Sequence, residues 1–446
     1  MDISTEAIQQ VVTLLREAMD REPKAEEQRS GYDLEVSVRQ VLQLVGVRLL
    51  KELVENEEER YPSTEVACRC GGKAQYLFRR KAQTLSTLGW VEYRRAYYVC
   101  PECHRGQHPL DQRLGLRPGR VSVAMAELLA MEGIEVSFEE AQHKVAKMLL
   151  VEVSENTVRN VTQELGALRA EAEGLWIQKS REGYDVLERR RLRDKPPDRL
   201  YGAVDGVIIP VDDEWRELKC GCWYSVEKRA ESSAQVGETG DLQATQIEYY
   251  CDICDVQHFR DLAWATGYQR QADRAREVVF VADGAPWIWK LVTEEFPGAT
   301  QIVDWYHAAE YLSGIAQSAF REEGPKEAWL ARTREQLWQG EIDAVIASCR
   351  EQEGQPGAAT AVQKAITYFS NNRERMDYKR FREQGYQIGS GTVESACKQI
   401  GTQRLKRPGA RWSAEGARLT AKARATWLSN QWDALVAQAL SAAQAA

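Results

Sequence analysis

The chain has 446 residues, a formal net charge of -8 and ten cysteines, a length typical of about two to four domains. Its apolar runs fall short of the roughly 18 residues that a membrane-spanning helix needs, and its N-terminal stretch lacks the basic start and apolar core of a signal peptide. We therefore expect a cytoplasmic protein with no membrane partner. In a reducing compartment, cysteines favour metal sites or buried thiols over disulfides.

The charge is unevenly distributed along the chain. Residues 1–66 carry 8 basic and 15 acidic side chains, whereas residues 68–120 carry 11 basic and 3 acidic ones. A second basic run follows Glu394, where residues 396–428 hold 8 basic side chains and only Glu415 as an acid. Local clusters of Lys and Arg neutralise phosphates whatever the total charge, so this pattern favours nucleic-acid contact at defined patches.

Residues 1–66 are predicted to be helical, and residues 67–118 are predicted to bind zinc. Apolar residues recur every three or four positions over residues 7–19 and 34–56, which predicts an N-terminal helical region over 1–66 ending near Pro62. Residues 67–118 contain two tight cysteine pairs beside turn-forming Gly71 and Pro101, separated by a strand-forming stretch. Two such pairs on a hairpin supply the tetrahedral thiolate set of structural zinc. The expected zinc ligands are Cys68, Cys70, Cys100 and Cys103.

The remaining polar residues of this zinc ribbon are assigned to the surface. His104 and His108 are possible substitute ligands, but four thiolates already complete the set, so we expect them at the surface or on phosphate. The hairpin between the cysteine pairs is rich in cations, which predicts a DNA-contacting module. These residues are Arg79, Arg80, Lys81, Arg94 and Arg95.

Residues 119–195 are expected to form a helical DNA-binding domain and a linker. Three short helices are predicted, the second opened by the capping pair Ser137 and Glu140 and the third by Ser154. In a helix-turn-helix arrangement the third helix would enter the major groove, although a plain three-helix bundle fits the same pattern. Its base-facing residues would be Asn156, Thr157, Arg159 and Asn160. The charged stretch 187–200 is typical of a linker.

Three acids then appear in contexts that suit metal binding. Asp205 lies within an apolar, β-branched run, Asp283 follows the predicted strand 278–282, and Glu394 begins a helix that residues 390–392 would cap. A single Asp-Gly pair is typical of a turn, but two strands and a helix can aim three carboxylates at one point. Three acids can hold two hard divalent cations, the arrangement used in two-metal phosphoryl transfer.

The basic run behind Glu394 would hold a DNA backbone over these acids. A salt-bridged helix exterior is the alternative, although such surfaces usually mix both signs. The residues assigned to DNA contact are Lys398, Arg404, Lys406, Arg407, Arg411 and Trp412.

Four motifs together resemble the ISKra-type insertion-sequence transposases, which are bacterial DDE enzymes with an RNase H-like core. They are "YGAVDG", "VFVADGAPWIW", "FPGATQIVDWYHAAEYL" and "GSGTVES…KRPGARWS", and the resemblance runs from the cysteine-rich module to about Leu428. It implies that Asp205, Asp283 and Glu394 are a catalytic triad for two Mg2+ ions, with Mn2+ as a substitute. The implied fold is multidomain α+β, with an RNase H-like core over 196–304 and 386–446 interrupted by a helical insertion over 305–385.

The insertion opens with "DWYH", residues 304–307, which is similar to the C/D-x-x-H motif of mutator-like transposases. That similarity places His307 near the scissile phosphate. The alternative is that Asp304 merely caps a helix and His307 belongs to its core. Trp305, Trp329 and Trp338 are expected in the core.

A second group of cysteines departs from the family pattern. Cys220 and Cys222 would share one face of a strand, which favours small buried side chains, and a second zinc site stays open. The other two members are Cys251 and Cys254.

The sequence therefore predicts a nucleoid-associated transposase. It would bind terminal inverted repeats and target DNA as a homodimer or larger homo-oligomer, and would cleave and join strands. The alternatives are an RNase H-like nuclease or resolvase without strand transfer, and a domesticated DNA-binding regulator.

Overall fold

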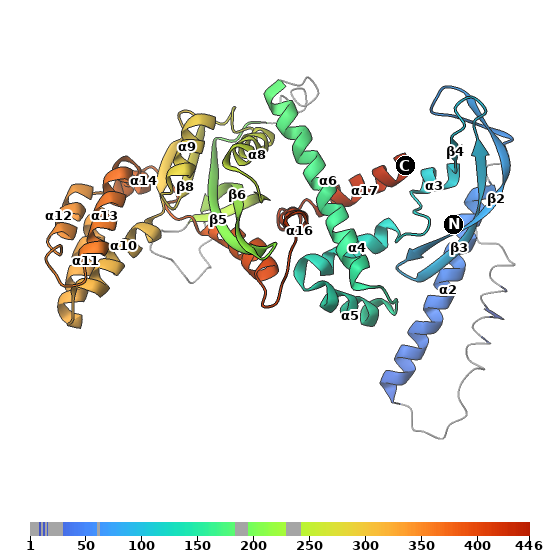
Figure 1. Ribbon diagram of the computed structural model, residues 1–446, viewed down its shortest axis with the longest axis horizontal. Helices are drawn as coiled ribbons and strands as arrows, with labels where there is room; N and C mark the ends of the chain where they lie inside the picture. The colour runs from blue at the N-terminus through green and yellow to red at the C-terminus, as the bar shows by residue number, and fades with distance from the viewer. Residues whose placement is uncertain are drawn as a thin grey trace. The chain divides into compact units, whose positions relative to one another are not determined.

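The computed structural model describes residues 30–59, 63–182, 195–228 and 242–446, with a few isolated positions before residue 30. They form a mixed α+β protein with two separate β-sheets, as expected from the sequence (Figure 1). The chain divides into two compact units, residues 1–168 with 432–446, and residues 169–431. The expected helix over 7–19 and Pro62 lie almost entirely outside the described residues.

The first unit is built on a long helix and an antiparallel sheet. Strands follow the order β1-β2-β3-β4, and β2 pairs with β3 along its length, with Lys81 opposite Arg94. Because β1 and β4 pair only near the start of β2 and the end of β3, the rest is a two-stranded ribbon. Val54 and Tyr93 are buried together where helix and ribbon pack. The elements are α2 (Gly31–Glu59), β1 (Glu65–Ala67), β2 (Lys73–Ser86), β3 (Gly89–Val99) and β4 (Gly106–Gln107).

Helices follow the ribbon, and the caps predicted at Ser137 and Ser154 are observed together with a further one at Ser122. The helix after Ser154, expected to be short, is 28 residues long. Ser122, Ser137 and Ser154 each accept a hydrogen bond from the backbone amide three residues later, which satisfies an amide that has no partner within the helix. The helix α6 crosses the boundary between the two units at Leu168. The helices of this region are α3 (Pro109–Leu114), α4 (Val123–Glu135), α5 (Phe138–Leu149), α6 (Glu155–Glu182) and the C-terminal α17 (Trp432–Ala445).

The second unit contains a five-stranded mixed sheet of order β7-β6-β5-β8-β9. Its first three strands are antiparallel, and β8 and β9 run parallel to β5. A helix connects β7 to β8, and this crossover places β8 parallel to β5 although about 70 residues separate the two strands in sequence. The strands are β5 (Arg199–Val211), β6 (Glu214–Lys228), β7 (Leu242–Asp252), β8 (Glu277–Ala282) and β9 (Thr300–Val303).

Helices cover both faces of this sheet. On one face, the Trp223 indole donates to Thr266 of α8 over 3.1 Å and packs on Phe296. On the other face, Gly401 sits against Val207 so closely that a Cβ there would clash. Side chains alternate along a strand, so Asp205 shares the second face with Val207. The covering elements are α8 (Val256–Gln269), α9 (Pro286–Glu295), α15 (Gly391–Ala396), the π-helical η2 (Cys397–Leu405) and α16 (Ala414–Leu428).

Between β9 and α15 the chain forms only helices and turns in a fully described stretch, grouped at one end of the sheet (Figure 1). Trp305 and Trp329 are buried there, and Trp338 packs on Trp305, as expected of core residues. The helices are α10 (Trp305–Ala319), α11 (Glu323–Trp338), α12 (Ile342–Arg350), α13 (Ala359–Asn372), the 3-10 turn η1 (Arg373–Arg375) and α14 (Tyr378–Glu383). Among the described residues, none of the helices combines the length and apolar character that a membrane crossing requires.

Candidate functional site

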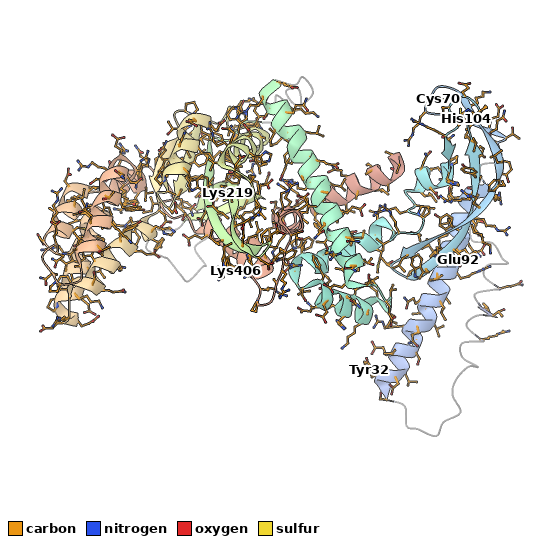
Figure 2. All side chains as sticks on the ribbon, in the orientation of Figure 1. Tyr32, Cys70, Glu92, His104, Lys219 and Lys406 are labelled. Carbon is orange, nitrogen blue, oxygen red and sulfur yellow. The ribbon has the colours of Figure 1, made fainter. Side chains whose placement is uncertain are left out.

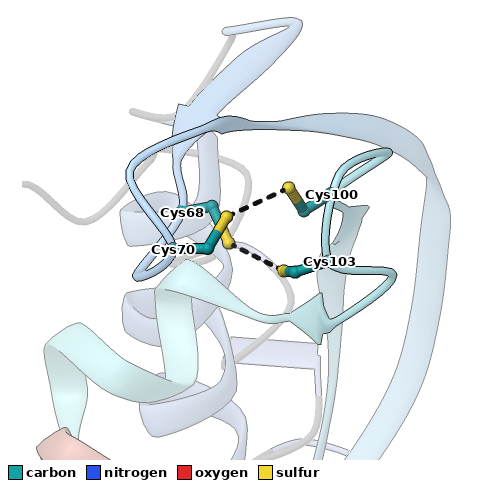
Figure 3. A group of neighbouring side chains, drawn as sticks. All are labelled: Cys68, Cys70, Cys100 and Cys103. Carbon is teal, nitrogen blue, oxygen red and sulfur yellow. Dashed lines mark hydrogen bonds between the residues drawn. The ribbon is translucent and has the colours of Figure 1, made fainter.

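The four cysteines predicted as zinc ligands come together at one end of the first sheet. Their sulfur atoms all lie within 4.8 Å of one another, and Cys68 and Cys103, like Cys70 and Cys100, are 3.6 Å apart (Figure 3). A tetrahedral zinc ion with bonds of about 2.3 Å separates its sulfurs by about 3.8 Å. The cluster therefore has the dimensions and the soft donors for a metal ion such as zinc.

Local backbone turns place these thiols. The Gly71 amide donates to the Cys68 carbonyl over 3.0 Å at a positive φ of 94°, and the His104 amide donates to the Cys100 carbonyl over 2.9 Å. The amides of Cys103 and Glu102 lower the pKa of the Cys100 thiol to about 7, whereas the neighbouring thiols raise the pKa of Cys70 against the Gly72 amide. One proton is thus easily lost from the cluster, and thiolates are the form that binds metal. His104 is not a member of the thiol cluster. His108 instead contacts the Ala96 carbonyl through Nδ1 at 2.9 Å.

The cations of the ribbon point to two different sides. Arg79, Lys81 and Arg94 are exposed and share one face, because Lys81 pairs with Arg94 and the strand alternates. Arg95 is on the opposite side, where it forms an ion pair with Asp111. Arg80 lies over the Tyr97 ring on that side at 5.1 Å. The ribbon thus offers only part of the predicted cation set on a single open face.

The helix predicted to enter the major groove begins at Glu155. Asn156, Arg159 and Asn160 are exposed near its start, while Val158 is fully buried. The Thr157 hydroxyl is 2.9 Å from that of Ser154, so it belongs to the helix cap. Three of the four predicted base-facing residues therefore have open side chains.

In the second unit, the parallel pairing of β5 and β8 brings two of the predicted acids together. Gly202 pairs with Phe280, and Asp205 and Asp283 each follow that pair by three residues. Asp205 lies within β5 and Asp283 directly follows the last residue of β8, so both lie toward the same end of the two parallel strands. Burial raises the pKa of Asp205, and the negative charge of Asp283 raises it further. The Gly206 amide, which donates to Asp205 over 2.7 Å, lowers this pKa but does not outweigh them.

The loop that carries Asp283 is fixed by the helices inserted after β9. The Tyr368 hydroxyl of α13 donates to the Asp283 carbonyl over 2.7 Å, and the Tyr368 ring stacks on Tyr311 of α10 at 4.0 Å. Gly284 has a positive φ of 99°, and a Cβ there would strike Tyr368. Nothing in the sequence singled out Tyr368, because its partner lies 85 residues away.

Glu394 and His307 approach each other from two further elements. His307 Nε2 is 3.6 Å from Glu394 Oε1, and the Ser390 hydroxyl donates to the same oxygen over 2.9 Å. The Glu394 side chain is 48 % exposed and that of His307 is 35 % exposed, so both can meet a ligand. A positive charge on His307 would also lower the pKa of Asp205, although burial and Asp283 together outweigh it.

The acids form a looser group than the cysteines. Among the described residues, the four thiols are the only group of three or more His, Cys, Asp or Glu side chains whose ligand atoms all lie within 4.8 Å of one another. The structure thus brings Asp205, Asp283, His307 and Glu394 to one region without closing them around a single point.

The basic run behind Glu394 separates into an internal half and a surface half. Lys398, Lys406 and Arg411 are exposed and Arg407 is partly exposed, and Lys406 lies over the Trp215 ring at 5.3 Å (Figure 2). Arg404 is only 2 % exposed and lies over Trp412, whose indole donates to the Leu405 carbonyl. The other buried members of the run are Lys422 and Arg424, and Arg418 is half-buried beside Asp252.

The second cysteine group does not form a compact metal site in the described residues. Cys220, Cys222 and Cys251 are buried in the core of the second sheet, and Cys254 is half-buried beyond its edge. They pack as small apolar side chains, which is the role the sequence favoured.

Comparison with known proteins reaches only the first part of the chain. Residues 25–189 match the model of an uncharacterised protein family, UPF0236. This segment covers the ribbon and the helices α2 to α6 but ends before β5, so it does not include the acidic site. No curated protein sequence matches the chain.

Proposed function

We propose that the chain is a DDE transposase of an insertion sequence, with Asp205, Asp283 and Glu394 as its catalytic carboxylates. The proposal rests on one observation: the parallel pairing of β5 and β8 brings Asp283, at the end of β8, close enough to Asp205 for its charge to raise the pKa of Asp205. His307 connects the group, since it lies 3.6 Å from Glu394 and near enough to Asp205 for a charge on its ring to act on that carboxylate.

The topology of the second unit supports this proposal. An RNase H-like core has three antiparallel strands followed by two parallel ones, with helices on both faces, and the order β7-β6-β5-β8-β9 agrees with it. The helices α10 to α14 lie between β9 and α15, the position that the resemblance implies for a helical insertion.

The chemistry of the donor set suits hard divalent cations. Carboxylate oxygens are preferred ligands of Mg2+, and burial together with the nearby charge of Asp283 raises the pKa of Asp205, a shift that a bound cation would oppose. Bound Mg2+, with Mn2+ as a substitute, would supply activation of a water or 3′-hydroxyl and stabilisation of the leaving oxygen. His307 would then contact the scissile phosphate from the side of Glu394.

Separate surfaces would hold the DNA. We assign backbone contacts near the acids to Lys398, Lys406, Arg407 and Arg411, and leave out Arg404 because it is buried. In the first unit, the exposed face of the ribbon and the exposed start of α6 would bind the terminal inverted repeats, and zinc on the four cysteines would stabilise the ribbon. Synapsis of two ends would require a homodimer or larger oligomer.

The direct test uses a plasmid that carries the gene of this chain with its native flanking DNA, so that any element ends are present. Purified protein with Mg2+ should nick or excise the element and join its ends to a second plasmid. Asp205→Asn, Asp283→Asn and Glu394→Gln should each retain DNA binding and lose cleavage. Glu383→Gln, an exposed acid on α14, is the matched control that should cleave normally.

A DNA-binding regulator is the second candidate, because the three acids are less tightly grouped than the four cysteines. Specific binding to the flanking DNA with no cleavage in Mg2+ or Mn2+ would favour it and refute the transposase. Cleavage without joining to the second plasmid would instead indicate a nuclease or resolvase with the same core.

A further inference from the structure

Asp304 is a buried carboxylate at the junction of the segments that carry the candidate site. It is 0 % exposed and stands immediately before α10. One carboxylate oxygen, Oδ1, accepts from the His307 amide over 2.7 Å, as the cap of a helix does. The other, Oδ2, accepts from the Ser390 amide, 86 residues further along the chain.

Each of these bonds ends next to a residue of the proposed site. The amide of Asp304 itself donates over 2.7 Å to the carbonyl of Ala282, which precedes Asp283. Ser390, held by Oδ2, donates its hydroxyl to Glu394. A parallel link joins the Trp305 amide to the Ile388 carbonyl over 3.0 Å. One buried residue therefore fixes the backbone near Asp283, His307 and Glu394 at the same time.

The chemistry of Asp304 exceeds what a helix cap needs. Ser, Thr and Asn also cap helices well, since one acceptor oxygen is enough. An ionised carboxylate accepts at both oxygens, whereas an Asn side chain has one accepting oxygen and turns a donating NH2 toward its second partner. Burying a carboxylate costs free energy unless hydrogen bonds compensate it. The second oxygen, bound to Ser390, is what only an acid supplies.

We propose that Asp304 is a positioning residue that sets the spacing of His307 and Glu394 relative to Asp283. This inference rests on the proposed function, because the spacing matters only if these residues act together on a phosphate. It gives Asp304 a role distinct from metal binding, since both of its oxygens accept from backbone amides and the residue is fully buried.

The chain supplies a matched control. Asp255 caps α8 by accepting from the His258 amide over 2.8 Å, and it is exposed. In Asp304→Asn and Asp255→Asn alike, the cap can persist through the amide oxygen, but only Asp304→Asn loses a second acceptor. Any effect confined to Asp304→Asn therefore reports the link to Ser390.

The experiment has one arm without catalysis and one with it. In metal-free protein, hydrogen exchange of the Ser390 amide should speed up about 10- to 100-fold in Asp304→Asn, the change expected for losing a charged buried acceptor. With the plasmid and Mg2+, the cleavage rate at saturating DNA should fall about 100-fold, the scale of a small misplacement, while DNA affinity stays within about twofold. Asp255→Asn should change neither quantity.

The two arms separate the failures. Unchanged exchange at Ser390 in Asp304→Asn overturns the proposed positioning, and so does faster exchange with cleavage at the wild-type rate. A parallel loss of cleavage and DNA affinity, with lower thermal stability, would also overturn it, because general unfolding would explain the loss. A wild-type protein that cleaves no DNA refutes the proposed function instead, and the positioning role falls with it even where exchange responds.

Discussion

Replacing Lys422 by Met should destabilise the second unit far more than its place in a basic run suggests. Lys422 is 2 % exposed, and its ammonium lies 2.5 Å from Glu173 Oε2, 2.7 Å from Asp252 Oδ2 and 2.9 Å from the Cys251 carbonyl. Glu173 and Asp252 are themselves buried. Removing Lys422 leaves Glu173 paired with Arg169 alone and Asp252 with Arg418 at 3.5 Å, so both buried carboxylates lose compensation. Breaking a buried pair costs about 3–5 kcal/mol.

The same loss should depend on pH. Burial alone would raise the pKa of Glu173, but the charges of Lys422 and Arg169 outweigh it and hold that pKa below its usual value of 4.5. A depressed pKa gives stability above the unfolded pKa that is lost as pH falls through the folded value. Without Lys422 the pKa of Glu173 should rise, so protonation relieves the variant in mild acid. The difference between wild type and Lys422→Met should therefore shrink between pH 7 and pH 4.

Thermal and denaturant unfolding at several pH values measure this difference. A cost of about 3–5 kcal/mol lowers the melting temperature by roughly 6–20 °C for a unit of this size. Lys364→Met, an exposed lysine on α13, is the control and should change stability by less than about 0.5 kcal/mol. Adding Glu173→Gln to Lys422→Met should restore part of the loss by removing one uncompensated charge. A loss below about 1 kcal/mol, or a loss that grows in acid, would refute the reasoning.

Three further predictions concern metal and DNA. Cys100→Ser should lower bound zinc from one equivalent per chain toward none and should lower the melting temperature of the first unit. Chelation of the wild type should have the same two effects. Two zinc equivalents in the wild type would instead indicate a second zinc site. Lys406→Ala and Arg411→Ala should each flatten the salt dependence of DNA binding by up to about 0.9 log units per log salt. Arg404→Ala should lower stability without changing that slope. The reversed pattern in a salt series would show that DNA contact was assigned to the wrong residues. Arg159→Ala should reduce the preference for flanking DNA over random DNA at fixed salt, and an unchanged preference would remove α6 from sequence reading.

Local chemistry allowed much of the architecture to be predicted from the sequence. The cysteine pairs beside Gly71 and Pro101 predicted the thiol cluster, because each pair needs only its own turn and the hairpin brings the pairs together. Ser137 and Ser154 predicted helix starts because a cap involves residues three apart. Asp283 followed by Gly284 marked a strand end with a positive φ. Each of these features is settled within a few residues.

Only the tertiary structure decided which charges are internal. A sum along the sequence gave Arg404 and Lys422 the same weight as Lys406, because counting does not reveal burial. Lys422 is internal because Glu173 lies beside it, 249 residues away in sequence. In the same way, Asp304 looked like an ordinary helix cap until the fold placed the Ser390 amide on its second oxygen. A cap is a local property of the chain, but a shared carboxylate needs a partner that only the packed sheet and helices bring near.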